Sequence, residues 1–303
     1  MRRNRIGASD LWVGEIGLGC MSIGTEEAPA VALIHEALDA GVTLLDTSDL
    51  YDEGRNEELV GRAIRGRREN VVVATKVGNR RIPGRDGWTW DPSKAYILSA
   101  VEGSLRRLGV DYIDLYQLHG GTIEDDIDET IEAFERLKQE GKIRHYGISS
   151  IRPNVIREYA SRSSIASVMN QYSLLDRRGE EEALPLLAAR GIGVIARGPV
   201  ASGALATNAS EAKLAKGYLD YTPEELRDVR EKLATFVGDG RSMEQLAIRF
   251  ALSHPAVSAV IPGARTPEQL RANLSAADVP PLSEEELAAL RAVTKANRYE
   301  LHR

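Results

Sequence analysis

Four side chains, Asp46, Tyr51, Lys76 and His119, are of the types needed to move a proton to or from a carbonyl oxygen. A tyrosine phenol titrates at about pH 10 and is a poor proton donor to a carbonyl unless its pKa falls. A buried ammonium beside the phenol favours the phenolate and lowers that pKa, while a carboxylate fixes the ammonium in place. A neutral imidazole can hydrogen-bond the substrate oxygen and orient it. The four residues therefore indicate tyrosine-based acid–base chemistry, provided that the fold brings them together.

Short β-branched runs alternate with longer amphipathic stretches along the chain, and this alternation predicts the elements that must position the four residues. We expect strands at Ile16–Met21, Thr43–Ser48, Val71–Val77, Ile113–His119, His145–Ser150, Ala166–Gln171, Gly193–Arg197 and Ser258–Pro262. We expect helices at Pro29–Ala40, Asn56–Arg65, Ser93–Leu108, Asp128–Glu140, Pro153–Ser161, Glu180–Ala189 and Ser242–Ser253.

Eight strand-plus-helix units of this length favour a (β/α)₈ TIM barrel, with a doubly wound open parallel sheet as the alternative. Several predicted helices are followed by glycine at the turn into the next strand, as at Gly41, Gly109 and Gly141. The segment Asn4–Val13 is expected to form a β-hairpin that closes the bottom of the barrel. We expect residues 1–303 to form a single barrel domain, with its chemistry at the C-terminal ends of the strands.

The composition excludes several classes of function. The 303 residues include 39 Lys and Arg against 45 Asp and Glu, a net charge of −6, which argues against a nucleic-acid partner. Cys20 is the single cysteine, so the chain has no disulfide framework and no cysteine-based metal site. Neither a signal peptide nor an apolar run of about 20 residues is found, so we expect a cytoplasmic protein without a membrane partner.

Five motifs occur in the order known from one enzyme family. The first two are Asp46-Thr-Ser-Asp-Leu-Tyr51 with Asn56-Glu-Glu-Leu-Val-Gly61, and Thr75-Lys-Val77. The others are Ser104–His119, the Gly141–Ser150 run GKIRHYGISS, and Ile261–Asn273 near the C-terminus. The set resembles the aldo-keto reductases, whose first motif reads D-T-A-x-x-Y-G…N-E-x-x-[IVL]-G, and in particular the branch that includes potassium-channel β subunits.

The resemblance implies NAD(P)H-dependent reduction of an aldehyde or ketone without a metal. Carried over by position, Tyr51 is the general acid in reduction and Lys76 lowers its pKa. Asp46 pairs with Lys76, and His119 orients the carbonyl.

The resemblance also implies a cofactor site at the later strand ends. Its expected members are Ser149, Ser150, Gln171, Arg197, Gly198, Pro199, Val200, Gly203, Gly263, Arg265, Gln269 and Asn273. Ser149 and Gln171 would hold the carboxamide, the Arg197–Gly203 loop would follow the pyrophosphate, and Gln269 and Asn273 could hold adenine. Many relatives carry Tyr at the position of Arg197; a guanidinium can likewise stack on a ring or reach a phosphate.

NADPH is the expected cofactor, with NADH possible. Arg265 stands beside the start of a predicted helix and can bind a 2′-phosphate by charge-assisted hydrogen bonds. Some relatives have Lys at the position of Gly263 and Arg at that of Gln269, and both are absent here.

Two loops are expected near the substrate. Trp88 and Trp90 lie in the long polar loop from Gly78 to Pro92 and suggest an apolar wall over a small-molecule carbonyl substrate, with simple packing on the barrel rim as the alternative. The polar, Ala-rich segment Thr207–Thr222 is expected to form a flap over the cofactor.

Three functions stay open at this point. The first is a working carbonyl reductase. The second is a catalytically silent NADPH-binding regulatory subunit, which would have no need of Tyr51. The third is a cofactor-free lyase or isomerase on the same barrel. The substrate and the oligomeric state are not indicated by the sequence.

Overall fold

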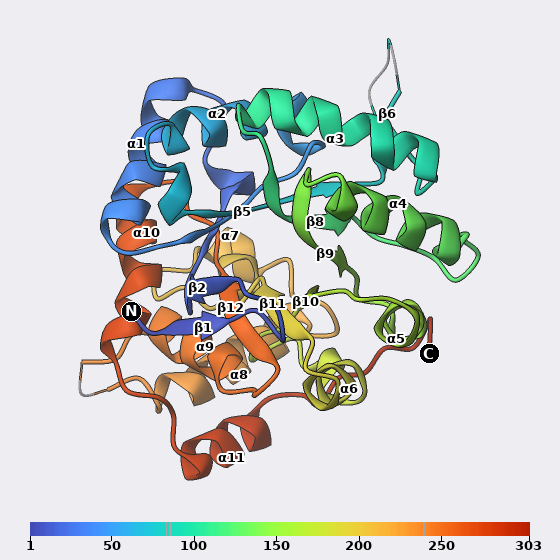
Figure 1. Cartoon of the computed structure of the whole chain (residues 1–303). Helices are drawn as coiled ribbons and strands as arrows, with labels where there is room; N and C mark the ends of the chain where they lie inside the picture. The colour runs from blue at the N-terminus through green and yellow to red at the C-terminus, as the bar shows by residue number, and fades with distance from the viewer. Residues whose placement is uncertain (83, 85–86, 239) are drawn as a thin grey trace.

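Eight parallel strands form a barrel in the computed structural model, which describes residues 1–82, 84, 87–238 and 240–303. The strand order is β12-β11-β10-β9-β8-β5-β4-β3. Parallel bridges from Ile16 to Val260 and from Gly19 to Gly263 join the first strand to the last. Helices surround these strands (Figure 1). The predicted (β/α)₈ barrel is therefore confirmed, and the open sheet is excluded.

The barrel strands lie close to their predicted positions. They are β3 (Leu18–Gly19), β4 (Leu44–Asp46), β5 (Val72–Val77), β8 (Ile113–Leu118), β9 (Ile143–Ser149), β10 (Ser167–Gln171), β11 (Gly193–Arg197) and β12 (Val257–Ile261). The prediction for the first strand was wrong in length, because the chain leaves the ladder at Cys20. Cys20–Ser22 form a 3₁₀ turn instead, closed by a hydrogen bond from the Ile23 N–H to the Cys20 carbonyl.

Amphipathic helices cover the barrel with their apolar faces. They are α1 (Glu27–Asp39), α2 (Arg55–Ile64), α3 (Lys94–Leu108), α4 (Ile127–Gln139), α5 (Pro153–Arg162), α6 (Ala183–Ala189), α7 (Glu211–Leu214), α8 (Pro223–Ala234), α9 (Met243–Leu252), α10 (Pro267–Leu274) and α11 (Glu284–Val293). Each of the seven predicted helices is present. α6 begins three residues later than predicted, because Arg178–Glu180 form a separate 3₁₀ turn. Capping boxes fix the starts of α8, α9 and α11.

The N-terminal hairpin closes the bottom of the barrel, as predicted. It consists of β1 (Arg3–Arg5) and β2 (Trp12–Gly14), paired antiparallel. Ile6, Leu11 and Val13 belong to the same buried cluster as the side chains that fill the barrel interior. A Cβ on Gly7 would lie 2.5 Å from the backbone nitrogen of Gly193, at the start of β11. The hairpin thus seals the end opposite the C-terminal strand ends.

The alternation of side chains along each strand decides which groups point into the barrel. Leu44, Ala74 and Leu115 belong to the interior cluster. Two residues further along the same three strands come Asp46, Lys76 and Gln117, which therefore also face inward, one layer higher. The polar layer begins where the apolar filling of the barrel ends.

Two excursions cover the upper rim. β6 (Asn79–Arg81) and β7 (Trp88–Trp90) form a hairpin after β5, and residues 83, 85 and 86 of the predicted Gly78–Pro92 loop lie outside the described residues. This hairpin projects from the barrel (Figure 1). The segment 207–222 contains α7 and a bridge between Tyr218 and Tyr221. Within the described part of the chain, no helix is both long and apolar enough to cross a bilayer.

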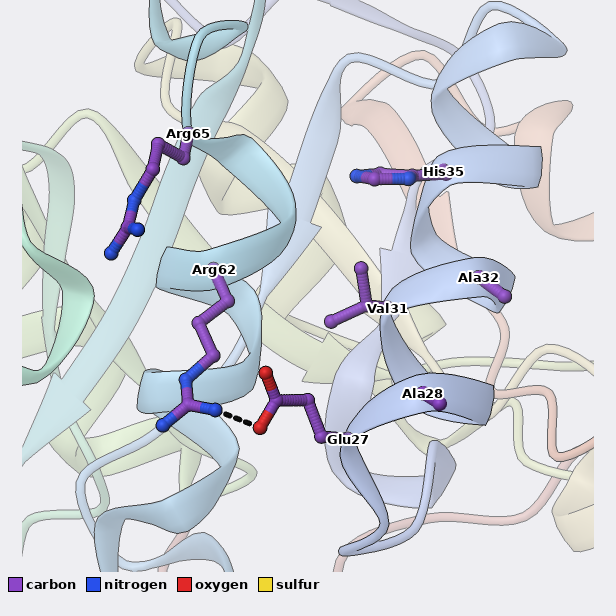
Figure 2. A pocket seen from close by; sticks show the side chains of 7 residues that line it. All are labelled: Glu27, Ala28, Val31, Ala32, His35, Arg62 and Arg65. Atoms are coloured by element: carbon purple, nitrogen blue, oxygen red, sulfur yellow. Dashed lines mark ion pairs between the residues drawn. The ribbon is translucent and has the colours of Figure 1, made fainter.

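A surface groove of about 800 Å³ lies between α1 and α2, on the outer flank of the barrel (Figure 2). Glu27 forms an ion pair with Arg62 across it. The His35 Nε2 atom is bonded to the Ala63 carbonyl at 3.0 Å. The groove contains none of the predicted site residues.

The close contact between α2 and α3 gives a test of the packing. A Cβ on Gly61 in α2 would lie 2.7 Å from the carbonyl carbon of Leu108 at the end of α3. Gly→Ala normally stabilises a helix by about 1 kcal/mol. In Gly61→Ala we expect the clash to prevail and the free energy of unfolding to fall by about 1–3 kcal/mol, as measured by denaturant titration. The control is Gly238→Ala, because a Cβ there meets no atom of the described residues within 4 Å apart from its own chain neighbours. Equal stability of G61A and wild type would refute the close contact.

Candidate active site

The Lys76 ammonium is the centre of the polar layer above the apolar filling of the barrel. It lies at the end of β5 and is 1% exposed, and Asp46 at the end of β4 is 4% exposed. The Lys76 Nζ donates to Asp46 Oδ2 at 2.8 Å and to the Thr47 carbonyl at 2.7 Å. A third bond, at 3.3 Å, reaches the Tyr51 hydroxyl. The ammonium therefore has three oxygen partners and bridges the carboxylate to the phenol.

Tyr51 is brought to Lys76 by a tight turn rather than by a strand. Its N–H donates to the Ser48 carbonyl at 3.2 Å. The next two residues, Asp52 and Glu53, have φ of 46° and 63°, a left-handed backbone that non-glycine residues adopt at a cost. Gly54 continues this conformation with φ of 86° and leads into α2. The reversal lets the phenol fold back over the strand ends.

The start of α2 is tied to the ends of β4 and β5. Thr47 Oγ1 donates to Asn56 Oδ1 at 2.7 Å, and Asn56 Nδ2 donates to the Cys20 carbonyl at 2.8 Å. Thr75 Oγ1 donates to Glu57 Oε1 at 2.6 Å. These bonds are buried, which makes them costly to break. They hold both ends of the turn that carries Tyr51.

His119 directly follows β8 and faces Tyr51. The two rings are 5.9 Å apart between centroids and stand edge to face at 84°. Its Nδ1 lies 3.1 Å from Ser48 Oγ, and its backbone N–H donates to the Val77 carbonyl at 2.7 Å. The structure therefore brings all four residues predicted to act on the substrate to one mouth of the barrel.

Burial controls the protonation of these groups. It lowers the pKa of His119 to about 3, assisted by the positive charges of Lys76 and Arg197, so the imidazole is neutral at physiological pH. Burial by itself would lower the pKa of Lys76. The charges and hydrogen bonds of Asp46 and Tyr51 have a larger effect in the opposite direction, so the pKa of Lys76 is raised. The pKa of Tyr51 is raised as well, because burial exceeds the opposing effect of Lys76. The ammonium thus acts on Tyr51 in the predicted direction, but the phenol remains protonated.

Arg197 occupies the centre of the predicted carboxamide-binding region. Its Nη1 donates to Gln171 Oε1 at 2.7 Å, and Gln171 Nε2 donates to the Tyr218 hydroxyl at 3.0 Å. Its charge also favours the ionised forms of Asp46 and Tyr51. Arg197, an expected member of the cofactor region, therefore contacts Gln171 and also acts on the acid–base group through its charge.

Ser149 and Ser150 stand at the end of β9, next to β10. Ser150 is buried, and its Oγ accepts from the Arg152 N–H at 3.2 Å. The Ser150 carbonyl accepts from Asn170 Nδ2 at 2.9 Å. Ser149 is half-buried at the strand tip. Of the two serine hydroxyls, Ser150 is thus engaged within its own loop.

The loop after β11 exposes backbone in unusual conformations. Gly198 and Gly203 have φ of 66° and 85°, and between them Ala201 and Ser202 also have positive φ. Lys213 of α7 closes over this loop, since its Nζ donates to the Ser202 carbonyl at 2.5 Å. Pro199 and Val200 form the turn between the strand and these residues. Small side chains and a left-handed backbone give a phosphate group access to backbone N–H groups.

The segment before α10 forms the second half of the cofactor region. Thr266 caps α10 by accepting from the Gln269 N–H at 3.3 Å, and Gln269 Oε1 accepts from the Arg265 N–H at 2.9 Å. The Arg265 side chain is exposed beside this helix N-terminus. Asn273 is buried and donates to the Gly263 carbonyl at 3.1 Å, so its amide group shapes the loop. Gln269 and Asn273, predicted to hold adenine, thus both bond backbone atoms of this loop.

The two tryptophans of the β6–β7 hairpin differ in their surroundings. Trp90 Nε1 donates to Asp125 Oδ1 at 2.9 Å, and its ring lies against the backbone of Gly78 and Gly120. Trp88 is 51% exposed. Trp90 is thus held in the rim, and Trp88 presents a free apolar surface.

Sequence reasoning missed three side chains of this region: Ser48, Asp49 and Tyr218. Ser48 could have been found as a polar residue at the end of an inward-facing strand. Tyr218 could not, because it lies 47 residues from Gln171 and only the folded chain shows the contact.

The residues that the structure describes include no group of three or more His, Cys, Asp or Glu that could hold a metal ion. Burial raises the pKa of the Cys20 thiol, which makes it a packing residue.

The buried pair gives a prediction on stability and its pH dependence. Lys76→Met leaves the Asp46 carboxylate buried without its cation, which we expect to cost about 3–5 kcal/mol of unfolding free energy. Burial raises the pKa of Asp46, so in the variant the folded state keeps a proton that the unfolded chain releases. The stability of K76M should therefore rise as pH falls from about 8 to about 5. Denaturant titrations at the two pH values measure this change.

The double variant Asp46→Asn/Lys76→Met is the matched control for that experiment. It removes the carboxylate that the single variant leaves unpaired, so we expect it to recover stability and to lose the pH dependence. A double variant as unstable and as pH-dependent as K76M would show that the charge of Asp46 is not the cause.

Comparisons with known proteins confirm the family resemblance and the fold. Residues 15–295 match the Aldo/keto reductase family. An uncharacterized oxidoreductase, YqkF, from Bacillus subtilis (strain 168) is 56% identical over 307 residues, covering 100% of both chains. The holo form of aldo-keto reductase AKR11C1 from Bacillus halodurans has a TM-score of 0.95 at 52% identity, over 100% of this chain and 99% of that chain.

Two further solved structures are similar. The apo form of the same Bacillus halodurans protein has a TM-score of 0.86 at 48% identity, over 100% of this chain and 99% of that chain. The glycerol dehydrogenase AKR11B4 from Gluconobacter oxydans has a TM-score of 0.85 at 28% identity, over 99% of this chain and 98% of that chain. The chain therefore belongs to the aldo-keto reductase family of oxidoreductases.

Proposed function

We propose that the chain reduces an aldehyde or ketone to an alcohol, with NADPH as hydride donor and Tyr51 as general acid. One observation carries the proposal: the buried Lys76 ammonium contacts both Asp46 and the Tyr51 hydroxyl. The Asp46 carboxylate and the Thr47 carbonyl accept two of the hydrogen bonds of this lysine, and the third is directed at the phenol. The lysine therefore has the position required to stabilise a phenolate at the mouth of the barrel.

Each residue of the group has a defined part in the proton transfer. The Tyr51 phenol is protonated at neutral pH and gives its proton to the carbonyl oxygen as the carbonyl carbon is reduced. The Lys76 ammonium keeps its proton and stabilises the phenolate that remains. Asp46 holds the ammonium in place, and the neutral His119 hydrogen-bonds the substrate oxygen. In alcohol oxidation the same phenolate takes the proton back.

The cofactor region fits a nicotinamide dinucleotide. A bound dinucleotide of this kind supplies the hydride. Ser149, Gln171 and Arg197 would contact the nicotinamide end, the loop Gly198–Gly203 the pyrophosphate, and Arg265 the adenosine 2′-phosphate. The exposed guanidinium beside a capped helix N-terminus supports the last assignment. The chain also resembles the holo form of the Bacillus halodurans relative more closely than its apo form.

The substrate is proposed to be a small carbonyl compound that contacts Trp88. The exposed ring lies on the hairpin that follows the Lys76 strand, whereas Trp90 is already bonded to Asp125.

The absence of a cysteine framework agrees with action in the reducing cytoplasm.

Tyr51→Phe tests the acid–base role. The variant keeps the ring and its packing but has no proton to give, so we expect the rate of NADPH-dependent carbonyl reduction to fall by about 100-fold or more. NADPH binding, followed by fluorescence titration, should be unchanged. Tyr112→Phe is the matched control, since that ring lies against Arg68, away from the site. Undiminished turnover in Y51F would refute the mechanism.

The same experiment separates the alternatives. A silent regulatory subunit would bind NADPH tightly and reduce none of a broad panel of carbonyl compounds. A lyase or isomerase would show no NADPH binding. The contact between Lys76 and the Tyr51 hydroxyl disfavours the silent subunit, which has no need of an activated phenol. NADPH binding is the observation that separates the reductase from a lyase or isomerase.

Arg265→Gln tests the cofactor preference. We expect the Kd for NADPH to rise about tenfold or more, because a charge-assisted pair with the 2′-phosphate is lost, while the Kd for NADH stays constant. Arg271→Gln is the matched control, on the helix α10 that follows Arg265, where the guanidinium pairs with Glu36 at 2.6 Å. Equal losses for NADPH and NADH would assign Arg265 a role other than 2′-phosphate binding.

A further inference from the structure

The Ser48 hydroxyl lies between the ring of His119 and the carboxylate of Asp49. Ser48 Oγ is 3.1 Å from His119 Nδ1 and 3.3 Å from Asp49 Oδ1. It also accepts from the Leu50 N–H at 3.2 Å. Ser48 is completely buried, so its hydroxyl has no alternative partner in bulk water. The hydroxyl can therefore donate its one proton either to the Asp49 carboxylate or to an unprotonated Nδ1 of His119.

Two arrangements of protons satisfy these contacts when the carboxyl proton, if present, lies on the Oδ1 atom that faces Ser48. If Asp49 is ionised, the Ser48 hydroxyl donates to the carboxylate, and the same oxygen accepts from a protonated Nδ1 of His119. If Asp49 is protonated, it can donate to Ser48, whose hydroxyl is then free to donate to an unprotonated Nδ1. Since the imidazole is neutral, its single proton lies on Nδ1 in the first arrangement and on Nε2 in the second.

We propose that Ser48 is a positioning residue whose hydroxyl, oriented by Asp49, fixes which ring nitrogen of His119 carries the proton. The inference rests on the proposed function, because His119 is taken to contact the substrate oxygen. With the proton on Nε2, that nitrogen donates to a carbonyl oxygen, as reduction requires. With the proton on Nδ1, Nε2 can only accept, as suits an alcohol hydroxyl.

The charges around Asp49 place its titration close to neutrality. Burial, assisted by the negative charge of Glu57 on α2, raises the pKa of Asp49 to about 7, against the opposing effect of Arg107 on α3. Tyr96 on α3 and Tyr116 on β8 also face this carboxyl group. Lys76 and Arg197 face His119 and keep its ring neutral. Asp49 can therefore change its charge while the imidazole does not.

Ser48 is a departure from the family motif. The pattern D-T-A-x-x-Y-G carries Ala at this position, where no hydroxyl could contact the histidine. The sequence Asp46-Thr-Ser-Asp places the hydroxyl and the carboxylate on consecutive residues. The arrangement is therefore a property of this chain's own residues rather than of the motif.

The decisive measurement is the tautomer of His119, which needs neither substrate nor turnover. Long-range ¹H–¹⁵N spectra of histidine-labelled protein distinguish a protonated from an unprotonated ring nitrogen, and His119→Gln assigns the signals. We expect the proton to lie on Nε2 at about pH 5.5 and on Nδ1 at about pH 8.5, with the change centred near the pKa of Asp49, about 7. In Asp49→Asn and in Ser48→Ala the change with pH should be lost. An invariant tautomer in the wild type, or the same change in S48A, would overturn the proposal.

Kinetics provide the second readout. We expect Ser48→Ala to lower kcat for carbonyl reduction about tenfold with little change in KM, since one hydrogen bond orienting the ring is lost. The matched controls are Ser161→Ala and Asp111→Asn, both at exposed positions. Failure of the proposed reductase function would appear as no turnover in the wild type with the tautomer change intact. Failure of this inference would appear as full turnover with no tautomer change.

Discussion

The Asp46–Lys76 ion pair is the interaction on which the rest of the site depends. Both groups lie in the barrel interior and are almost fully removed from water. Such a pair is tolerated only when further hydrogen bonds satisfy the ions, and here the Thr47 carbonyl and the Tyr51 hydroxyl do so. The contact between Lys76 and the Tyr51 hydroxyl therefore both positions the phenol and satisfies the buried ammonium. The parallel strands bring Asp46 and Lys76 together because neighbouring strand ends meet at one level of the barrel.

Much of the first motif acts on structure rather than on chemistry. Thr47, Asn56 and Glu57 join β4, β5 and α2 through buried bonds. The turn between them contains left-handed residues that cost free energy, and these bonds offset that cost. Rigid support of this kind holds Tyr51 within reach of the ammonium. Much of the motif therefore serves to hold the Tyr51 phenol in place.

The expected cofactor region is already internally bonded. Arg197 holds Gln171, which holds Tyr218, while Asn273 bonds the Gly263 carbonyl. Gln171 keeps one lone pair on Oε1 and one hydrogen on Nε2, through which a nicotinamide carboxamide could bond it. Segment 207–222 takes part through Tyr218 and through Lys213, which reaches the Ser202 carbonyl. The region predicted as a flap is therefore connected to both the strand end and the loop that it would cover.

The sequence by itself indicated the barrel, the hairpin and the group of four residues that contains Asp46, Tyr51, Lys76 and His119. Strand and helix periodicity and the order of five motifs are local signals, and they need no knowledge of distant contacts. Only the tertiary structure showed that Ser48 touches His119, that Gln171 touches Tyr218, and that the pKa of Tyr51 is raised rather than lowered. Contacts between residues 47 or 71 positions apart, and the balance of burial against charge, depend on where the folded chain excludes water. Neither these distant contacts nor this balance can be derived from the spacing of residues along the sequence.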